Sequence, residues 1–281
     1  MKKSSSATAI KRQTTTGKMA GAVEPDLDAA MQLMAIPGKS GEESKVVRFL
    51  RQRLEKAGAP ADGITIDQTP EKSPLGGDTG GLIFKLPGTL RGKRRLLMAH
   101  IDTVPLCEGC EPVRRNGYIE SANPATGLGA DDRAGTTVIL TAALEILRRK
   151  LPHPPLTFFW PVQEEVGLFG ARYVPISALG KPSLASKWDG SDSDHVTIAA
   201  TGPYRLIIHV SGIASHAGGA PEKGVSAIAI ASLAIADLHQ NGWHGAIQKN
   251  GRYGTSNVGI FQGGAATNVL TDRAFVKAEA R

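Results

Sequence analysis

The sequence lacks the features that mark secreted and membrane-spanning proteins. Its longest apolar stretch, residues 225–238, is rich in alanine and too short to cross a bilayer, so it predicts a buried helix. No apolar segment follows the basic residues near the N-terminus, which argues against a secretory signal. We therefore expect a cytoplasmic protein with no membrane partner.

Cysteine is scarce as well. Cys107 and Cys110 form a lone Cys-x-x-Cys with no second pair, so a structural zinc site of four thiolates is not predicted. A redox role would require a thioredoxin-like strand-to-helix setting, which the surrounding glycines and prolines do not suggest. The pattern favours loop thiols of a reducing compartment.

Basic charge is concentrated in the first 23 residues. Of a formal net charge of +7, this tail carries five basic residues and no acidic one, which leaves the remainder near neutrality. A near-neutral body gives no electrostatic reason to expect nucleic acid as a partner. The tail is rich in Ser and Thr and poor in large apolar residues, which predicts a disordered segment over residues 1–24. A transit peptide is the alternative, and the single arginine argues against it.

The remaining chain has the composition of a globular protein and is long enough for two domains. It has 281 residues, of which 41% are hydrophobic and 21% charged. Helical periodicity and short apolar runs alternate over residues 25–194, which predicts an α/β domain with a mostly parallel sheet and flanking helices. The expected strands are 82–86, 96–101, 156–162 and 183–188, and the expected helices run from the cap at Ser40 up to Gly58 and over residues 135–150.

The first of these helices begins with Ser40-Gly-Glu-Glu43. This pattern predicts a capping box with Ser40 at the N-cap and Glu43 at N3. After residue 194 the rhythm changes, and we expect a smaller α+β domain over residues 195–281. Its expected strands are 204–210, 256–261 and 274–278, and its expected helix is 224–239.

Histidine and acidic residues follow several of the predicted strands. His100 and Asp102 are two positions apart in an extended segment, so Asp102 can contact His100 and fix its tautomer for metal binding. Glu164 and Glu165 follow the next strand, and adjacent side chains diverge. One glutamate can therefore bind a metal while the other reaches a water bound to that metal.

Two further acids complete the pattern. Asp131 opens the second helix in Gly-Ala-Asp-Asp-Arg-Ala-Gly, and Asp189 follows the strand of residues 183–188. Ligands in open α/β sheets bind at the carboxyl ends of strands, and one histidine with several carboxylates suits Zn²⁺. Each motif alone has an ordinary alternative: a surface pair, a helix cap, a solvated loop or a turn. Their combination in this order favours a metal site.

Together these motifs resemble the dinuclear zinc exopeptidases that include peptidase T, glutamate carboxypeptidase and aminoacylase. The resemblance implies that His100, Asp131 and Asp189 bind one Zn²⁺ and that Asp131 and Glu165 bind a second. It implies that Glu164 is the general base and Asp102 the partner of His100. The glutamyl aminopeptidases share the Gln-Glu-Glu-Val-Gly motif, but their inserted domain between His-x-Asp and the bridging aspartate is absent here.

The second domain carries two matching motifs. Ser215-His216-Ala-Gly-Gly resembles the lid-domain motif whose histidine enters the active site of the partner subunit in dimeric members. Gly-Gly-Ala-Ala-Thr-Asn268-Val resembles a later motif that contacts substrate. The resemblance thus implies a homodimer formed through the lid, with His216 in catalysis and in substrate binding. A turn histidine is the alternative for His216, and for Asn268 both interpretations stay open.

The resemblance implies hydrolysis of an amide bond in a small peptide or N-acyl amino acid, in an aminopeptidase-like reaction with two Zn²⁺ ions. The family's last zinc ligand is a histidine that follows the lid, and we expect it to be missing because the chain ends at Arg281. The second metal would then keep only Asp131 and Glu165 as ligands. Three interpretations follow: a fragment of a longer hydrolase, a truncated inactive or single-metal homologue, and a binding or dimerising protein.

Overall fold

The structure is a computed structural model that describes residues 24–190 and 194–281. The described residues divide into two compact units, 24–190 and 194–281, each with its own sheet. The disorder predicted for residues 1–24 concerns a segment that, apart from Glu24, lies outside the described residues.

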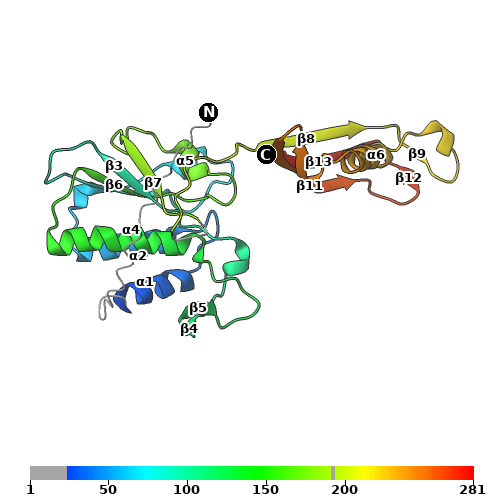
Figure 1. Cartoon of the computed structure of the whole chain (residues 1–281). Coiled ribbons are helices and arrows are strands. Elements are labelled where there is room, and N and C mark those ends of the chain that lie inside the picture. Colours follow the sequence, from blue (N-terminus) through cyan, green and yellow to red (C-terminus); the bar gives the residue numbers. More distant parts are fainter. Residues whose placement is uncertain (1–23, 191–193) are drawn as a thin grey trace, which may run out of the picture. The chain divides into compact units, whose positions relative to one another are not determined.

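The first unit is built on a five-stranded mixed sheet (Figure 1). The strands in sheet order are β1 (Ile64–Ile66), β2 (Leu82–Leu86), β6 (Leu156–Trp160), β3 (Arg95–Met98) and β7 (Leu184–Lys187). The strand β3 is parallel to both β6 and β7, whereas β2 is antiparallel to both β1 and β6. The predicted α/β class is confirmed, with the parallel part of the sheet confined to β6, β3 and β7.

One face of this sheet is covered by helices. The helices α2 (Ser44–Lys56) and α4 (Ala130–Arg149) pack on it, and α1 (Glu24–Ala35) packs against α4 (Figure 1). The strands contribute alternate side chains to this core, including the stacked rings of Phe84, Phe158 and Trp160. Full burial of one such side chain stabilises the fold by about 1.5–3 kcal/mol.

The opposite face carries a smaller core formed by Ile83, Leu96, Phe159 and Leu179. The short helices α3 (Thr69–Lys72) and α5 (Phe169–Tyr173) contact each other. A separate hairpin joins β4 (Pro112–Arg115) to β5 (Tyr118–Ser121). Its turn residues Asn116 and Gly117 both have positive φ, as the Asn-Gly pair predicts, so the sequence held a signal for this hairpin that we did not use.

The predicted capping box is wrong. The helix α2 begins at Ser44, and its N-cap residue Glu43 makes no side-chain cap hydrogen bond. Ser40 Oγ instead donates to Asp102 Oδ2 at 2.6 Å, and Glu43 Oε1 accepts from the Gln163 amide at 3.0 Å. Partners distant in sequence therefore replace the local cap.

The second unit has a four-stranded antiparallel sheet in the order β10-β11-β13-β8. Its strands are β8 (Tyr204–Ser211), β10 (Gly245–Lys249), β11 (Arg252–Gly263) and β13 (Arg273–Ala280). The helix α6 (Ala227–Gln240) packs on this sheet, and its N-cap Ser226 accepts from the Ala229 amide at 3.2 Å. A two-stranded pair, β9 (Ser215–His216) and β12 (Val269–Leu270), lies at the end of the unit.

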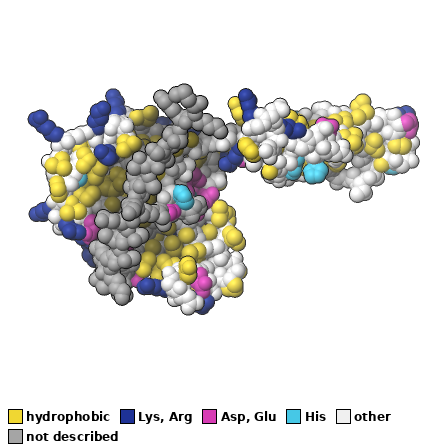
Figure 2. Space-filling view, viewed as in Figure 1, with side chains coloured by type: hydrophobic (Ala, Val, Ile, Leu, Met, Phe, Trp, Pro, Cys, Tyr) yellow, Lys and Arg dark blue, Asp and Glu magenta, His cyan; other side chains and the backbone are white. Residues whose placement is uncertain are grey.

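Many large apolar side chains of this unit are exposed, and hydrophobic side chains form scattered patches on its visible face (Figure 2). They include Leu206, Ile207, Ile208, Leu233 and Tyr253. None of the helices in the described part of the chain is long and apolar enough to cross a membrane.

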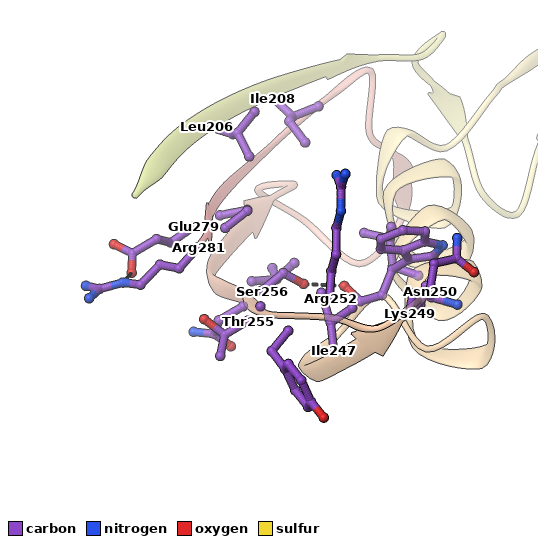
Figure 3. A pocket seen from close by; sticks show the side chains of 18 residues that line it. Leu206, Ile208, Ile247, Lys249, Asn250, Arg252, Thr255, Ser256, Glu279 and Arg281 are labelled. Atoms are coloured by element: carbon purple, nitrogen blue, oxygen red, sulfur yellow. Dashed lines mark hydrogen bonds and ion pairs between the residues drawn. The ribbon is translucent and has the colours of Figure 1, made fainter. Parts of the chain in front are cut away.

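A cavity of about 800 Å³ lies between β8, β10, β11 and β13 and the end of α6 (Figure 3). Its lining residues include no histidine or cysteine, and their one acidic residue, Glu279, pairs with Arg205 and Arg281. The lining of this cavity therefore offers no group of metal ligands.

Candidate metal centre

Three parallel strands deliver the predicted ligands to one edge of the first sheet. His100 follows β3, Glu164 and Glu165 follow β6, and Asp189 follows β7. The carboxyl ends of parallel strands meet at the same edge, where α/β sheets bind their ligands. The remaining acid, Asp131, lies in the first turn of α4, where its φ/ψ angles and those of Asp132 are not helical.

The imidazole of His100 is held from its Nδ1 side. Nδ1 lies 3.1 Å from the Asp102 carbonyl oxygen and 3.3 Å from Asp102 Oδ1. Both His100 and Asp102 are almost completely buried. These acceptors place a proton on Nδ1, and Nε2 is the ring nitrogen that faces the open side of the site.

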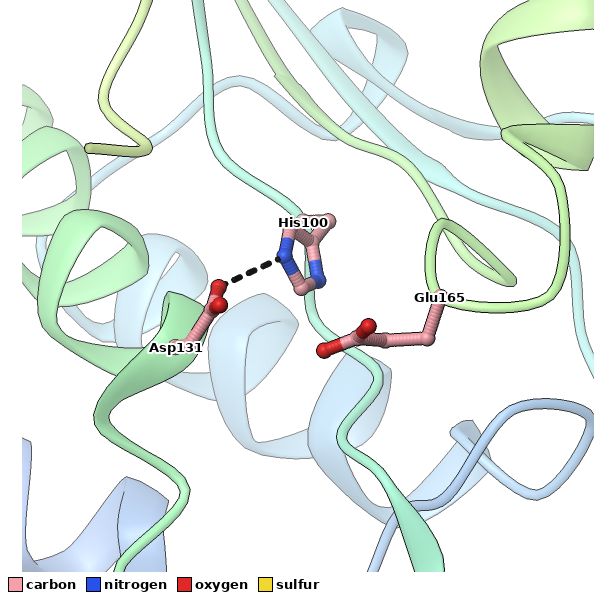
Figure 4. Close-up of side chains that lie close together, drawn as sticks. All are labelled: His100, Asp131 and Glu165. Atoms are coloured by element: carbon pink, nitrogen blue, oxygen red, sulfur yellow. Dashed lines mark hydrogen bonds and ion pairs between the residues drawn. The ribbon is translucent and has the colours of Figure 1, made fainter. Parts of the chain in front are cut away.

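Carboxylates converge on this open side (Figure 4). His100 Nε2 lies 3.1 Å from Asp131 Oδ1 and 3.9 Å from Asp189 Oδ2. Ligand atoms of His100, Asp131 and Glu165 all lie within 4.8 Å of one another, and those of His100, Glu164 and Asp189 form a second such group. An imidazole nitrogen and several carboxylate oxygens at this separation require a cation between them, either a proton or a metal ion.

The protonation of His100 agrees with this requirement. Burial lowers the pKa of His100, but the hydrogen bond and charge of Asp102, together with the charge of Asp132, outweigh it and raise that pKa to about 9. Burial and the charges of neighbouring carboxylates raise the pKa of Glu165 as well. The site therefore binds positive charge strongly at neutral pH.

The turn that carries both glutamates is fixed by its backbone amides. Asp102 Oδ1 accepts from the Glu164 amide at 2.9 Å, and Asp102 Oδ2 accepts from the Glu165 amide at 3.1 Å. Burial would raise the pKa of Asp102, but its hydrogen bonds with His100, Ser40 and the Glu164 amide hold it below its usual value. One ionised carboxylate thus orients the histidine and both glutamates.

A second buried acid, Asp132, holds the start of α4. Its carboxylate accepts from the backbone amides of His100 and Gly135, each at 3.1 Å. Gly135 lies so close to β7 that a Cβ on it would overlap the Trp188 carbonyl oxygen. Burial raises the pKa of Asp132 to about 8, and the charges of Asp189 and Asp131 add to that effect while His100 opposes it.

Lys187, the last residue of β7, adds a positive charge on the open side. Its Nζ lies 2.8 Å from Glu164 Oε1 and forms an ion pair with Asp189. Burial lowers the pKa of Lys187, but these two carboxylates outweigh it and raise the pKa above its usual value. Lys187 remains charged and partly neutralises the acidic group.

The second unit brings its two predicted site residues together. His216 in β9 pairs with Val269 in β12, and the Ala217 amide donates to the Asn268 carbonyl at 2.9 Å. His216 Nδ1 accepts from the amides of Gly218 and Gly219 at 3.2 and 3.0 Å. Assigned from these donors, the proton is on Nε2 of this exposed imidazole, where it can be donated to a ligand.

Four residues at the first site were not predicted as functional: Ser40, Glu43, Asp132 and Lys187. Ser40 and Glu43 were assigned to a helix cap, and their true partners are distant in sequence. The position of Asp132 next to Asp131 could have marked it as functional, whereas nothing in the sequence distinguishes Lys187 from a surface lysine. The loop thiols Cys107 and Cys110 are free, and Cys110 Sγ donates to the Leu128 carbonyl at 3.4 Å.

Two family models match different parts of the chain. The model described as peptidase family M28 matches residues 82–187, which carry His100, Asp131 and both glutamates. The model described as a peptidase dimerisation domain matches residues 198–281, within the second unit. A metallopeptidase segment and a dimerisation domain thus follow each other in one chain.

Solved structures and a sequence relative agree with this assignment. A tripeptidase from Staphylococcus aureus is 30% identical with a TM-score of 0.74, and the match covers 92% of this chain and 66% of that one. Aminopeptidase PepT from Bacillus cereus is 32% identical with a TM-score of 0.72, over the same shares of the two chains.

An uncharacterised protein from Bacillus subtilis is 32% identical over 259 residues, which are 91% of this chain and 65% of that protein. The chain therefore spans about two thirds of the length of these relatives. The order of its motifs, the acidic edge of its sheet and these similarities agree, and we conclude that the chain belongs to the metallopeptidase family that includes peptidase T.

Proposed function

We propose that the chain belongs to an aminopeptidase-like enzyme that hydrolyses an amide bond in a small peptide or N-acyl amino acid with the aid of two Zn²⁺ ions. One observation carries the proposal: ligand atoms of His100 lie within 4.8 Å of two carboxylates in each of two groups, with Asp131 and Glu165 in one and with Glu164 and Asp189 in the other. Nitrogen and carboxylate donors at this spacing fit Zn²⁺.

The ligands divide between the two ions. His100, Asp131 and Asp189 would hold one ion, and Asp131 would also hold the second together with Glu165. Asp102 would orient His100 through Nδ1, as carboxylates do for metal-binding histidines. When bound, the ions would lower the pKa of a water towards neutrality and polarise the amide carbonyl.

Glu164 would act as the general base. Its side chain is about one-fifth exposed, and its oxygen belongs to the ligand group of His100 and Asp189, so it lies within reach of a water at the site. Glu164 would accept a proton from the attacking water and return it to the leaving amine. Lys187 would hold the carboxylate of Glu164 in place until then.

The second unit would complete the site in a homodimer. The match to a peptidase dimerisation domain and the exposed apolar side chains of this unit support pairing of two copies. His216 from a second copy would donate its Nε2 proton to the substrate carbonyl oxygen as charge develops there, and Asn268 would contact the substrate. The tripeptidase and the aminopeptidase among the similar structures support a peptide substrate.

The test combines metal analysis with an activity assay on the purified chain. Zn²⁺ binding would be measured by titration and by mass spectrometry, and hydrolysis would be followed on tripeptides and N-acyl amino acids. We expect Zn²⁺ binding that His100→Ala removes, and hydrolysis that requires Zn²⁺. A chain that bound no divalent ion would contradict the proposal.

A second candidate is a homologue with one metal ion that acts as a binding or dimerising protein. It is favoured by the observation that His100 is the one histidine in the ligand groups of the described residues. A single bound Zn²⁺ per chain, dimer formation and no hydrolysis of any substrate would support this candidate over the first.

A further inference from the structure

The loop of residues 37–43, called the positioning loop below, contacts several segments that carry the proposed metal centre. The Gly38 carbonyl accepts from the Thr103 amide at 3.1 Å and from Arg133 Nη2 at 3.3 Å. Arg133 is almost fully buried and follows directly after the two aspartates of α4. The loop is therefore joined to the strand end of His100 and to the start of α4.

Ser40 joins this loop to the carboxylate that organises the site. Its hydroxyl donates to Asp102 Oδ2 at 2.6 Å, and the same oxygen accepts from the Glu165 amide. A hydroxyl donor restricts the rotation of the Asp102 carboxylate and helps to hold it ionised. The orientation of Asp102 in turn determines where the Glu164 and Glu165 amides lie.

Glu43 joins the same loop to the turn of the two glutamates. It is fully buried, and its Oε1 accepts from the Gln163 amide at 3.0 Å. Gln163 has a φ of 55°, a left-handed conformation that a non-glycine residue keeps only when its surroundings hold it there. Its side chain is bonded to Ser73 Oγ at 2.5 Å and to the Gly76 carbonyl at 2.6 Å.

Three successive backbone amides of one turn therefore donate hydrogen bonds to two buried acidic side chains. The Glu43 side chain accepts a hydrogen bond from the Gln163 amide, and the Asp102 side chain accepts hydrogen bonds from the amides of Glu164 and Glu165. Capping of α2 does not explain the buried carboxyl group of Glu43, because its side chain makes no cap hydrogen bond to that helix. Burying a carboxylate costs free energy, which is consistent with a role in the site instead.

We propose that Ser40 and Glu43 are positioning residues that hold the turn of residues 163–165, and with it the distance from Glu164 and Glu165 to His100. The inference rests on the proposed function, since it assigns these two residues to the same metal centre. Loss of a residue that orients metal ligands typically lowers metal affinity or activity by about 10–100-fold.

Two pairs of variants separate positioning from a general effect on the fold. Glu43→Gln keeps an oxygen that can accept from the Gln163 amide, and Glu43→Ala removes it. Ser40→Thr keeps the hydroxyl, and Ser40→Ala removes it. Ser44→Ala is the matched control, because its hydroxyl donates to Asp78 at an exposed position outside the site.

The experiment measures Zn²⁺ affinity by competition with a chelator, and amide hydrogen exchange of peptides covering residues 163–165, in the full chain. We expect Glu43→Ala and Ser40→Ala to weaken Zn²⁺ binding by about 10–100-fold and to speed exchange in that turn. Glu43→Gln and Ser40→Thr should restore most of both quantities, and Ser44→Ala should change neither.

Two outcomes would overturn the inference, and they can be told apart. If wild type bound Zn²⁺ and Glu43→Ala bound it equally tightly at a lower melting temperature, Glu43 would be structural and the proposed function would stand. If wild type bound no divalent ion, the proposed function would fail, and the positioning role would fail with it.

Discussion

The acids around His100 fall into two groups that differ in burial. Asp102 and Asp132 are almost inaccessible, and their oxygens accept backbone amides and the Ser40 hydroxyl. Asp131 is 73% exposed and Asp189 23% exposed, and both face His100 Nε2. The acids of the first group are bonded within the fold, whereas those of the second face the open side, where a metal ion would compete with Lys187 for Asp189.

This difference indicates how a metal site can be kept ready before a metal arrives. The buried acids fix backbone segments and the imidazole, so the exposed acids converge without needing bonds to one another. Ligands held in this way lose little freedom when the ion binds, and that favours tight binding. The following variants test whether the two groups are in fact separable.

The largest effect is expected for the two adjacent glutamates. Glu164→Gln should lower the rate of hydrolysis by about 10²–10⁴-fold and leave the Zn²⁺ content unchanged, because a general base is lost and a ligand is not. Glu165→Gln should lower the Zn²⁺ content. Both variants keep the backbone amides that donate to Asp102, so each variant is a control for a general disturbance of the turn by the other. If Glu164→Gln lost Zn²⁺, Glu164 would be a metal ligand, which would contradict its assignment as the general base.

Glu43 is a further buried acid of the first unit, and the pH dependence of stability tests it. Burial raises the pKa of Glu43 to about 7 from 4.5, so the folded chain retains a proton that the unfolded chain releases. Wild type should therefore lose stability relative to Glu43→Gln as the pH rises from about 4.5 to 7, by up to about 3 kcal/mol, with no further change above pH 7. Denaturant unfolding of both proteins at several pH values measures this, and parallel curves would contradict it.

A pair of aspartates tests the comparison directly. Asp102→Asn should destabilise the chain by about 1–3 kcal/mol without metal, because its neutral side chain has only one oxygen for the amides of Glu164 and Glu165. Asp131→Asn should change that stability by less than about 0.5 kcal/mol, since Asp131 is exposed, and yet lower Zn²⁺ affinity. Melting curves in the presence of a chelator measure the stability, and Zn²⁺ titrations measure the affinity. An equal loss of stability in both variants would contradict the division of the acids into two groups.

The smallest effect is expected for the lysine on the exposed side. Lys187→Met removes a positive charge that pairs with Glu164 and Asp189, so Zn²⁺ affinity should rise, by less than about 10-fold because the ion pairs are partly exposed. Lys85→Met on β2 is the control, since its strand leads to none of the proposed ligands. Weaker Zn²⁺ binding in Lys187→Met alone would show that Lys187 orders these acids more than it repels the metal ion.

The sequence predicted the parts of the molecule whose signals are local. Each apolar run of the first domain became a strand, and the acids that follow β3, β6 and β7 meet because parallel strands share an edge. The helix expected from residue 135 begins nominally at Ala130, although Asp131 and Asp132 do not have helical angles. The polar hairpin β4–β5 lacks apolar alternation, and only its Asn-Gly turn marks it.

The interactions between distant segments were not predictable in the same way. Ser40 and Glu43 have the spacing of a capping box, and only the folded chain shows that Asp102 and Gln163 compete for them. Lys187 lies at the end of a short strand, and its partner Glu164 is more than twenty residues away. Such pairs depend on strand order, which hydrophobic patterns alone do not determine.

The missing side chain at Gly135 bears on the choice of ion. Because even a methyl group there would meet the Trp188 carbonyl, the start of α4 approaches the end of β7 as closely as two backbones allow. Asp131 and Asp189 are attached to these two segments, so the gap between their oxygens depends on that approach. A larger residue should force the segments apart and shift selectivity from compact ions towards those of greater radius, such as Ca²⁺.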